Sequence, residues 1–515
     1  MEATPRTITL VNARIWTADP ARPHAHTLTL RDGLITAIDE TPTGECLDMQ
    51  GHWIGPAFID AHLHLTLGAA TLSQCDLTRC ASRAEFEVRL AKHARALDAQ
   101  GEPDAWLIAF GWNESDWHGE APTKAWLDGV GARPTVAWRM DQHACVVNSA
   151  ALAHLDTSPI DGGEIELEHG LFREQAAWKR VLPAIPALSP AAKRANLARA
   201  CQHLHALGIG SVGSMEYLTD LGEIDLAMRE ALSLRVHATV LDRDWPLETP
   251  PTLPKDSSAF FRIVGMKSFA DGTLGSRTAW MLDPYADKPE TCGLAMEHTL
   301  QGKLAAWMRA VQTLGLSPSI HAIGDHAART LLDALDACAD DPAPRFEHAQ
   351  TLHPRDLPRL AGRFASMQPL HKADDARQAL ARLGAERLER FFPFRALVAH
   401  GARLAFGSDW PIVSADPLLG IKAAVTGLDL DGRPFATAHS ISVHDALVAY
   451  TRTAAEMLQL PSGVLAQGRV ADLVVLDRSP FEVDWSTETP RVLETIVAGR
   501  SVHRSCAANA LQTAE

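Results

Sequence analysis

The sequence predicts an α/β fold: a (β/α)8 TIM-type barrel with a small composite β-sandwich from both termini and an insertion after the first barrel strand. Three observations predict it. Short apolar segments alternate with helix-like segments through the middle of the chain, both ends are rich in strand-forming residues, and the first interval between apolar segments is far longer than one helix needs. A chain of 515 residues is also too long for one small hydrophobic core.

Eight apolar segments predict the barrel. They lack the polar alternation of a half-exposed strand, and helical patterns such as residues 193–208 and 301–315 lie between them. Apolar runs of this kind, each followed by a helix, are typical of a parallel sheet that is covered on both faces. Eight strand–helix units therefore predict a TIM-type barrel. The predicted strands are residues 57–65, 208–215, 234–241, 262–272, 316–325, 344–350, 363–371 and 403–411.

The two ends of the chain predict one small sheet domain. Residues 7–40 are β-rich and contain Asp32-Gly33, a dipeptide typical of a two-residue hairpin turn. Residues 468–477 and 493–503 have the same character. We therefore predict a composite β-sandwich of residues 1–55 and 460–515, a barrel domain of residues 56–459, and an insertion of about residues 70–190 over the barrel mouth.

Composition and charge exclude several classes of partner. The net charge of -15 is spread along the chain, which argues against a nucleic-acid or anionic-membrane surface. No apolar run approaches the roughly 20 residues that span a bilayer, and the start of the chain predicts no signal peptide. The eight cysteines form no CxxC motif, so reduced thiols in a cytoplasm are the simplest reading. We expect a cytoplasmic protein with a small-molecule substrate, and the sequence leaves a homo-oligomer open.

The first predicted strand ends in FIDAHLHL, with His62 and His64 two residues apart. In a β-strand, residues i and i+2 lie on the same face, so both imidazoles leave the strand together. This spacing suits two ligands of one metal ion. It equally suits two strand-end histidines that bond to backbone and solvent, so the pair alone is a weak signal.

The ends of other predicted strands strengthen the metal interpretation. His321, His348 and Asp409 end the fifth, sixth and eighth strands. In a barrel of this kind the carboxyl ends of the strands meet at one face, where the chemistry takes place. Four imidazoles and a carboxylate are therefore expected to converge. Such nitrogen and oxygen donors suit zinc, and also manganese, iron, cobalt or nickel.

Lys267 lies inside the fourth predicted strand, where an unpaired charge is costly. It could form an ion pair inside the barrel with Asp271 or Glu347. Alternatively, a desolvated neutral amine could react with carbon dioxide to give a carbamate, an anionic bridge between two metal ions. The residue alone favours the ion pair, whereas the surrounding ligands favour the carbamate.

The chain resembles the amidohydrolase superfamily, specifically its amidohydrolase-3 branch of YtcJ-like and N-substituted formamide deformylase-like proteins. The motifs that carry the resemblance are GPAFIDAHLHL, GMKSFADGTLGSRTA, HAIGDHA, FEHAQ, GSDWP and GVLAQGRVADLVVLD, in the family's order and across nearly the whole chain. One departure is Ala57, where the family commonly has glycine. The resemblance implies a distorted barrel with a composite β-sandwich.

The resemblance also implies a ligand set. His62, His64 and Asp409 would hold one divalent metal ion, expected to be zinc, and His321 and His348 would hold a second. Lys267, carboxylated to N6-carboxylysine, would bridge the two ions. Because the family varies between one and two metals, the count stays open.

These residues predict the chemistry of a metal-dependent hydrolase. A metal-bound water would give a hydroxide nucleophile near neutral pH. Asp409 is suited to take a proton from that water and pass it to a leaving nitrogen. We expect cleavage of a non-peptide carbon–nitrogen bond in an amide, an N-substituted formamide or a cyclic amide.

Two kinds of alternative function remain: another hydrolytic reaction at the same metal site, and a barrel that binds metal without catalysis. A deaminase, an esterase or a lactonase could use the same hydroxide, and a non-catalytic metal-binding barrel is less consistent with a complete ligand set. The sequence contains no GxSxG motif, which argues against a covalent serine route.

Four further residues are candidates for contact with the substrate. Trp112 and His143 lie in the predicted insertion, where an aromatic-rich mouth fits a compact amide. Asp271 and Arg277 follow the lysine of the fourth strand. Trp112 and His143 could instead be structural, and Arg277 could instead pair with a carboxylate such as Asp283.

Overall fold

The computed structural model describes residues 7–99, 101, 105–117, 121–140, 142, 144–160, 163–231, 233–241, 253, 258–339 and 341–506. The chain forms two compact units. Unit 1 comprises Met1–Thr66 and Leu197–Glu515, and unit 2 comprises Leu67–Asn196.

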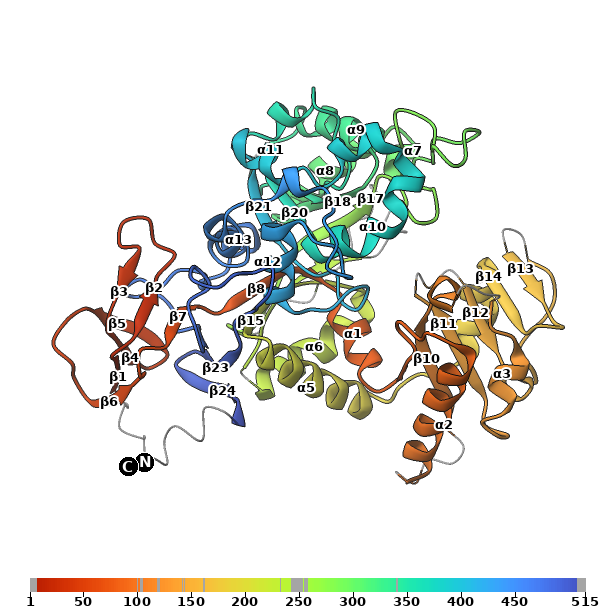
Figure 1. Ribbon diagram of the computed structural model, residues 1–515, viewed down its shortest axis with the longest axis horizontal. Helices are drawn as coiled ribbons and strands as arrows, with labels where there is room; N and C mark the ends of the chain where they lie inside the picture. Colours follow the sequence, from red (N-terminus) through yellow and green to blue (C-terminus); the bar gives the residue numbers. More distant parts are fainter. Residues whose placement is uncertain are drawn as a thin grey trace. The chain divides into compact units, whose positions relative to one another are not determined.

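Unit 1 contains the predicted barrel, a sheet of eight parallel strands in the order β21-β20-β19-β18-β17-β16-β15-β8 (Figure 1). Every predicted strand corresponds to one of them, which confirms the fold class. Most of these strands are buried along their whole length, and this explains their apolar runs without alternation. The strands are β8 (Phe58–Leu63), β15 (Ile209–Glu216), β16 (Arg235–Val240), β17 (Phe261–Phe269), β18 (Ser317–Ala322), β19 (Arg345–His348), β20 (Phe364–Met367) and β21 (Arg403–Phe406).

Helices between the strands pack against the sheet, because each turns its apolar face toward it. In α9, for example, Ala327, Leu331 and Leu335 are buried, at the spacing of one helix face. Helices that contact barrel strands include α6 (Leu218–Ala231), α7 (Glu297–Leu300), α8 (Leu304–Thr313), α9 (Asp325–Leu335), α11 (Phe394–Ala399), α13 (Val443–Ala449) and α14 (Arg452–Leu458), while α10 (Pro369–Leu383) packs against α12 (Pro417–Thr426).

The barrel closes where the loop after β21 meets β8. The Asp409 backbone N–H donates to His62 O at 2.6 Å, and the His64 N–H donates to Trp410 O at 2.9 Å. Gly407 permits this close approach, because a Cβ at this position would lie 2.4 Å from His62 N. The buried Asp60 carboxylate also accepts from Ser408 N at 3.0 Å. The closure therefore fixes the backbone of three predicted site residues against one another.

Two sheets at the ends of the chain form the predicted sandwich. One sheet joins both termini, because β7 (Trp53–Pro56) pairs antiparallel with β22 (Leu473–Leu476). Figure 1 shows the red N-terminal strands beside the blue β23 and β24. The sheet orders are β24-β23-β22-β7-β2-β3 and β5-β4-β1-β6. The other strands are β1 (Thr7–Val11), β2 (Arg14–Trp16), β3 (His24–Ala25), β4 (Leu28–Arg31), β5 (Leu34–Ile38), β6 (Glu45–Asp48), β23 (Val492–Val497) and β24 (Arg500–Arg504).

The predicted hairpin turn is confirmed. Arg31 pairs with Leu34 across β4 and β5, so Asp32 and Gly33 are the two turn residues. Both have positive φ, at 52° and 79°, as a tight turn of this kind requires.

Unit 2 is an α/β unit with a core of its own. Its sheet has the order β13-β14-β12-β11-β10-β9, and its long helix is α2 (Arg83–Ala99). The other elements are β9 (Cys75–Asp76), β10 (Leu107–Trp112), β11 (Thr135–Arg139), β12 (Ala144–Val147), β13 (Gly163–Glu166), β14 (Leu171–Glu174), α3 (Lys124–Asp128) and α4 (Ser149–Leu152), while α1 (Leu65–Thr71) and α5 (Pro190–Ala206) cross the two unit boundaries.

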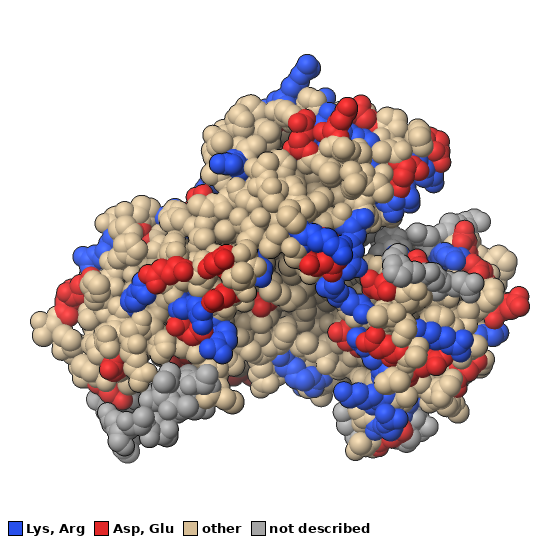
Figure 2. Space-filling view, viewed as in Figure 1, with Lys and Arg blue, Asp and Glu red and all other residues tan. Residues whose placement is uncertain are grey.

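The surface agrees with the spread of charge along the sequence. On the face in Figure 2, acidic and basic side chains are interspersed rather than gathered into one large patch of a single sign. Within the described ranges, the helices are too short or too polar to span a membrane.

Candidate metal centre

The predicted ligands lie at the carboxyl ends of the barrel strands. His62 is near the end of β8 with His64 just after it, His321 is near the end of β18, and His348 ends β19. Asp409 follows β21 by three residues. The strands are parallel and adjacent, so their ends bring together side chains that lie up to 347 positions apart in the sequence.

Three of these side chains form the tightest group. One ligand atom from each of His62, His348 and Asp409 lies within 4.8 Å of the other two, and all three residues are buried. The His62 ring centroid lies 5.0 Å from that of His348, which in turn lies 4.4 Å from that of His321. This group therefore combines residues from both of the ligand sets that the resemblance implies.

Hydrogen bonds hold the histidine rings in place. His62 Nδ1 donates to Glu347 Oε2 at 2.7 Å, and His348 Nδ1 donates to Gln368 Oε1 at 2.9 Å. These bonds leave the Nε2 atoms of both rings with their lone pairs. His321 instead donates from Nε2, to Gly272 O at 3.0 Å, which leaves Nδ1 with the lone pair. Metal-binding histidines are oriented in this way, so the donor set fits a metal ion.

Lys267 and His64 complete the group. Lys267 Nζ lies 3.1 Å from His62 Nε2 and 5.2 Å from the centre of the Phe269 ring, and the residue is 3% exposed. His64 Nε2 lies 3.2 Å from Asp409 Oδ1. The predicted lysine is therefore buried against the first histidine ligand.

Burial and charge set the protonation of the site. Burial lowers the pKa of His321 to about 3 and the pKa of His62 below its usual range. Burial would raise the pKa of Asp409, but the neighbouring His62 and His64 outweigh it and hold that pKa well below the usual value. These pKa shifts favour neutral imidazoles at His62 and His321 and an ionised carboxylate at Asp409 at pH 7, as metal binding requires.

Glu347, which the sequence suggested only as a possible ion-pair partner of Lys267, supports His62. It is fully buried, accepts from His62, and accepts from Ser319 Oγ at 2.6 Å. Burial would raise the pKa of its carboxyl, but His62 and the Arg345 charge outweigh that effect and lower it.

His371 is a fifth histidine at this end of the barrel that the sequence analysis did not single out. It lies in the first turn of α10, directly after β20, and its Nε2 is 3.8 Å from Asp409 Oδ2. The signal was present in the sequence, because His371 ends the predicted seventh strand.

Asp271 is a structural carboxylate rather than the predicted substrate contact. It is fully buried and accepts from the backbone N–H groups of Trp280, Ile323 and Gly324 at 2.8–3.0 Å. Burial raises its pKa to about 7 against the effect of these three donors. Its oxygens are thus committed to the loops that follow β17 and β18.

Arg277 forms an ion pair with Asp287 rather than with Asp283. Its Nη2 donates to Asp287 Oδ2 at 2.8 Å, not to Asp283. Asp287 also accepts from Arg382 of α10, so the loop after β17 is tied to that helix. This pairing supports the structural alternative for Arg277.

Trp112 is a core residue of unit 2, contrary to its prediction as a substrate contact. It is 1% exposed, packs in the core that also contains Phe86 and Leu127, and its indole donates to Ala137 O at 2.9 Å. An indole with its N–H satisfied and its ring buried has no surface for a ligand. The other predicted residue of the insertion, His143, lies outside the described residues.

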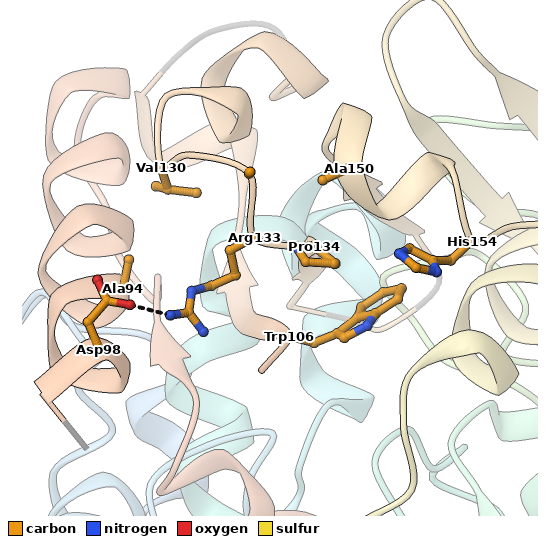
Figure 3. A pocket seen from close by; sticks show the side chains of 9 residues that line it. Ala94, Asp98, Trp106, Val130, Arg133, Pro134, Ala150 and His154 are labelled. Carbon is orange, nitrogen blue, oxygen red and sulfur yellow. Dashed lines mark hydrogen bonds and ion pairs between the residues drawn. The ribbon is translucent and has the colours of Figure 1, made fainter. Parts of the chain in front are cut away.

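Unit 2 also contains a hollow of about 550 Å³, which Figure 3 shows. Arg133 extends toward Asp98 and forms an ion pair with it, and Trp106 and His154 form another wall. Arg133 also donates to Ala105 O at 2.6 Å. The charged side chains that line this hollow therefore pair with each other. Its described lining residues do not include a cluster of metal ligands like that of the barrel.

Known proteins resemble the chain over nearly its whole length. YtcJ of Bacillus subtilis is 30% identical over 503 residues, which cover 90% of this chain and 91% of that protein. N-substituted formamide deformylase of Arthrobacter pascens is 26% identical and covers 95% of this chain and 96% of its own. An uncharacterized metal-dependent hydrolase from Pyrococcus horikoshii has a crystal structure with a TM-score of 0.78, at 28% identity over 93% of this chain and 99% of that chain.

These similarities confirm the resemblance found in the sequence, and they extend to a model of the family itself. The amidohydrolase family model matches residues 45–503, which include every predicted metal ligand. The chain belongs to the amidohydrolase family.

Proposed function

We propose that this protein is a metal-dependent hydrolase that cleaves a non-peptide carbon–nitrogen bond in an amide, an N-substituted formamide or a cyclic amide. One observation carries the proposal: His62, His348 and Asp409 are buried together with ligand atoms within 4.8 Å, and both histidines have their Nδ1 atoms fixed by acceptors. A ligand set that is oriented in this way, inside a family of hydrolases, fits a catalytic metal better than a structural histidine cluster.

In this proposal His62, His64 and Asp409 would hold one divalent ion, expected to be zinc, and His321 and His348 would hold a second. Lys267, as N6-carboxylysine, would be a ligand shared by both ions. Its amine is buried within 3.1 Å of His62, which favours a neutral nitrogen that can react with carbon dioxide. The nitrogen would form a bond to the carbon of carbon dioxide and lose one proton, which gives the carbamate anion.

A bound divalent metal would supply Lewis acidity and an activated water nucleophile. The protein supplies the proton transfer. Asp409 is ionised, so it can accept one proton from the attacking water. When the carbon–nitrogen bond breaks, its electron pair stays on nitrogen, and Asp409 returns the proton to that nitrogen. The products are a carboxylic acid and an amine.

One similar protein supports the proposal that the cleaved bond is a carbon–nitrogen bond. N-substituted formamide deformylase of Arthrobacter pascens, as its name says, acts on N-substituted formamides, and it resembles this chain over 95% of its length. The same ligand set could also serve a deaminase, an esterase or a lactonase, so the product has to be measured.

The test is a panel of N-substituted formamides, other amides, cyclic amides, esters and lactones. Each compound is incubated with zinc-loaded protein, with protein treated with a chelator, and with chelated protein to which zinc is returned. We expect an acid and an amine from at least one amide, loss of turnover with the chelator, and recovery with zinc. Ammonia release would mark a deaminase, and turnover of esters or lactones alone would contradict the carbon–nitrogen assignment.

A further inference from the structure

His371 lies at the edge of the predicted metal centre but takes no part in the hydrogen bonds that hold the other histidines. Its Nε2 is buried and has no hydrogen-bond partner among the described residues. The ring centroid lies 6.5 Å from that of His348. A buried polar atom without a partner is costly and uncommon in native proteins, so this nitrogen points to a ligand that it binds.

The two oxygens of Asp409 face different groups. Oδ1 lies 3.2 Å from His64 Nε2 and 3.5 Å from His62 Nε2. Oδ2 lies 3.8 Å from His371 Nε2, which is too far for a hydrogen bond. A single nitrogen or oxygen atom of a ligand can, however, lie within hydrogen-bond distance of both. One oxygen thus faces the predicted metal ligands, and the other faces His371.

The position of His371 is rigid. Pro369 begins α10, and the His371 backbone N–H donates to Gln368 O at 3.1 Å. The Gln368 side chain accepts from His348 Nδ1, so the same short segment holds a predicted metal ligand and His371. His371 is therefore placed beside Asp409 by a segment that also supports a predicted metal ligand.

We propose that His371 is a catalytic residue that contacts the substrate, with its Nε2 hydrogen-bonded to the leaving heteroatom beside Asp409 Oδ2. This inference rests on the proposed function. When an amide is cleaved, the N–H of the leaving nitrogen donates to His371 Nε2, and its lone pair receives the proton from Asp409. His371 accepts this N–H and so orients the nitrogen for protonation by Asp409.

The test varies the leaving group. The substrates are para-substituted anilides of the acyl group that the parent protein accepts best, with anilines of graded basicity. The proteins are the parent, His371→Ala, His371→Gln and the exposed control His400→Ala. Metal content is measured for each protein by elemental analysis.

We expect kcat/KM of His371→Ala to fall by about 100-fold for the most basic aniline and by less than about 10-fold for the least basic. His371→Gln should recover part of this loss, because its amide oxygen can accept the N–H. His400→Ala should match the parent, and metal content should be unchanged throughout. A basic leaving group needs more help to depart, so its dependence on His371 is the greater.

Two results would overturn the inference while leaving the proposed function intact. An equal loss for all anilides would give His371 a structural role, and loss of metal from His371→Ala would make it a ligand or a support of one. A parent that hydrolyses no formamide, amide or cyclic amide of the panel, anilides included, would contradict the proposed function itself.

Discussion

Glu347 accepts a hydrogen bond from His62 Nδ1 at 2.7 Å, and neither side chain is exposed to solvent. The carboxylate therefore fixes the ring and its tautomer before any ligand binds. Glu347 also lies between His62 and the buried Arg345, whose Nε is 3.6 Å from Glu347 Oε1. It links the predicted metal centre to the charged interior of the barrel.

Glu347→Gln is expected to weaken zinc binding by about 10- to 100-fold, because an amide accepts less strongly from His62 than a carboxylate does. The substitution keeps the volume of the side chain. Competition with a chromophoric chelator measures the affinity. The exposed Glu230→Gln is the matched control and should bind zinc like the parent. Equal affinities for both variants would contradict a supporting role for Glu347.

Asp409→Asn is expected to lower kcat by about 100- to 10,000-fold, because the amide cannot accept and return the proton. Steady-state rates on the best substrate of the panel measure the effect, and circular dichroism checks the fold. A variant that retains its metal and loses turnover separates the proton-transfer role from the ligand role. Turnover within about 10-fold of the parent would contradict the proton-transfer role.

Lys372 gives the free energy of unfolding a defined pH dependence. Its Nζ is buried and donates to Ala436 O at 3.2 Å, and burial lowers its pKa to about 8 from 10.5. Between these two values the unfolded chain binds one more proton than the folded chain. Stability therefore rises with pH from about 8 toward 10.5, and the cost of the buried charge is complete below about 8.

Lys372→Met is therefore expected to stabilise the protein at pH 7, on the order of 2 kcal/mol. This advantage should shrink by about 2 kcal/mol between pH 7 and pH 9.5, since the parent gains stability over this range. Urea denaturation at both pH values measures it, and the exposed Lys288→Met should follow the parent. An advantage that stays constant with pH would contradict the assignment to the buried amine.

Trp112→Phe tests the corrected role of this residue. The change removes the donor to Ala137 O and leaves space in the core of unit 2. We expect a loss of about 1–3 kcal/mol in the free energy of unfolding, with KM for the best substrate unchanged. Urea denaturation and steady-state kinetics on the same preparation measure both quantities. A raised KM with unchanged stability would restore the substrate contact.

The strands of the barrel were predictable because strands that are buried on both faces appear in the sequence as apolar runs without polar alternation. The segment 363–371 contains β20, and 403–411 contains β21. Both predictions extend too far, because the strand ends carry weaker signals. Pro369, which begins α10, marks one of these ends.

The convergence of the predicted ligands was predictable for a geometric reason, since parallel strands of a barrel place their carboxyl ends together. The hydrogen-bond partners of other buried polar side chains were not predictable. Asp271 accepts from Ile323 and Gly324, about fifty positions along the chain, and no local pattern announces such a contact. Trp112 was misread because a tryptophan in a core and one in a pocket look alike in sequence. His371 was missed although it ends the predicted seventh strand, because a single histidine at a strand end is usually structural.

The measurement that tests the central claim most directly is the number of metal ions per chain, by elemental analysis of protein purified without a histidine tag. The comparison is with the variant His62→Ala/His64→Ala. We predict about two metal ions per chain in the parent and a clear drop in the variant. A parent that binds none, even after incubation with zinc or manganese, would contradict the account and return these histidines to a structural role.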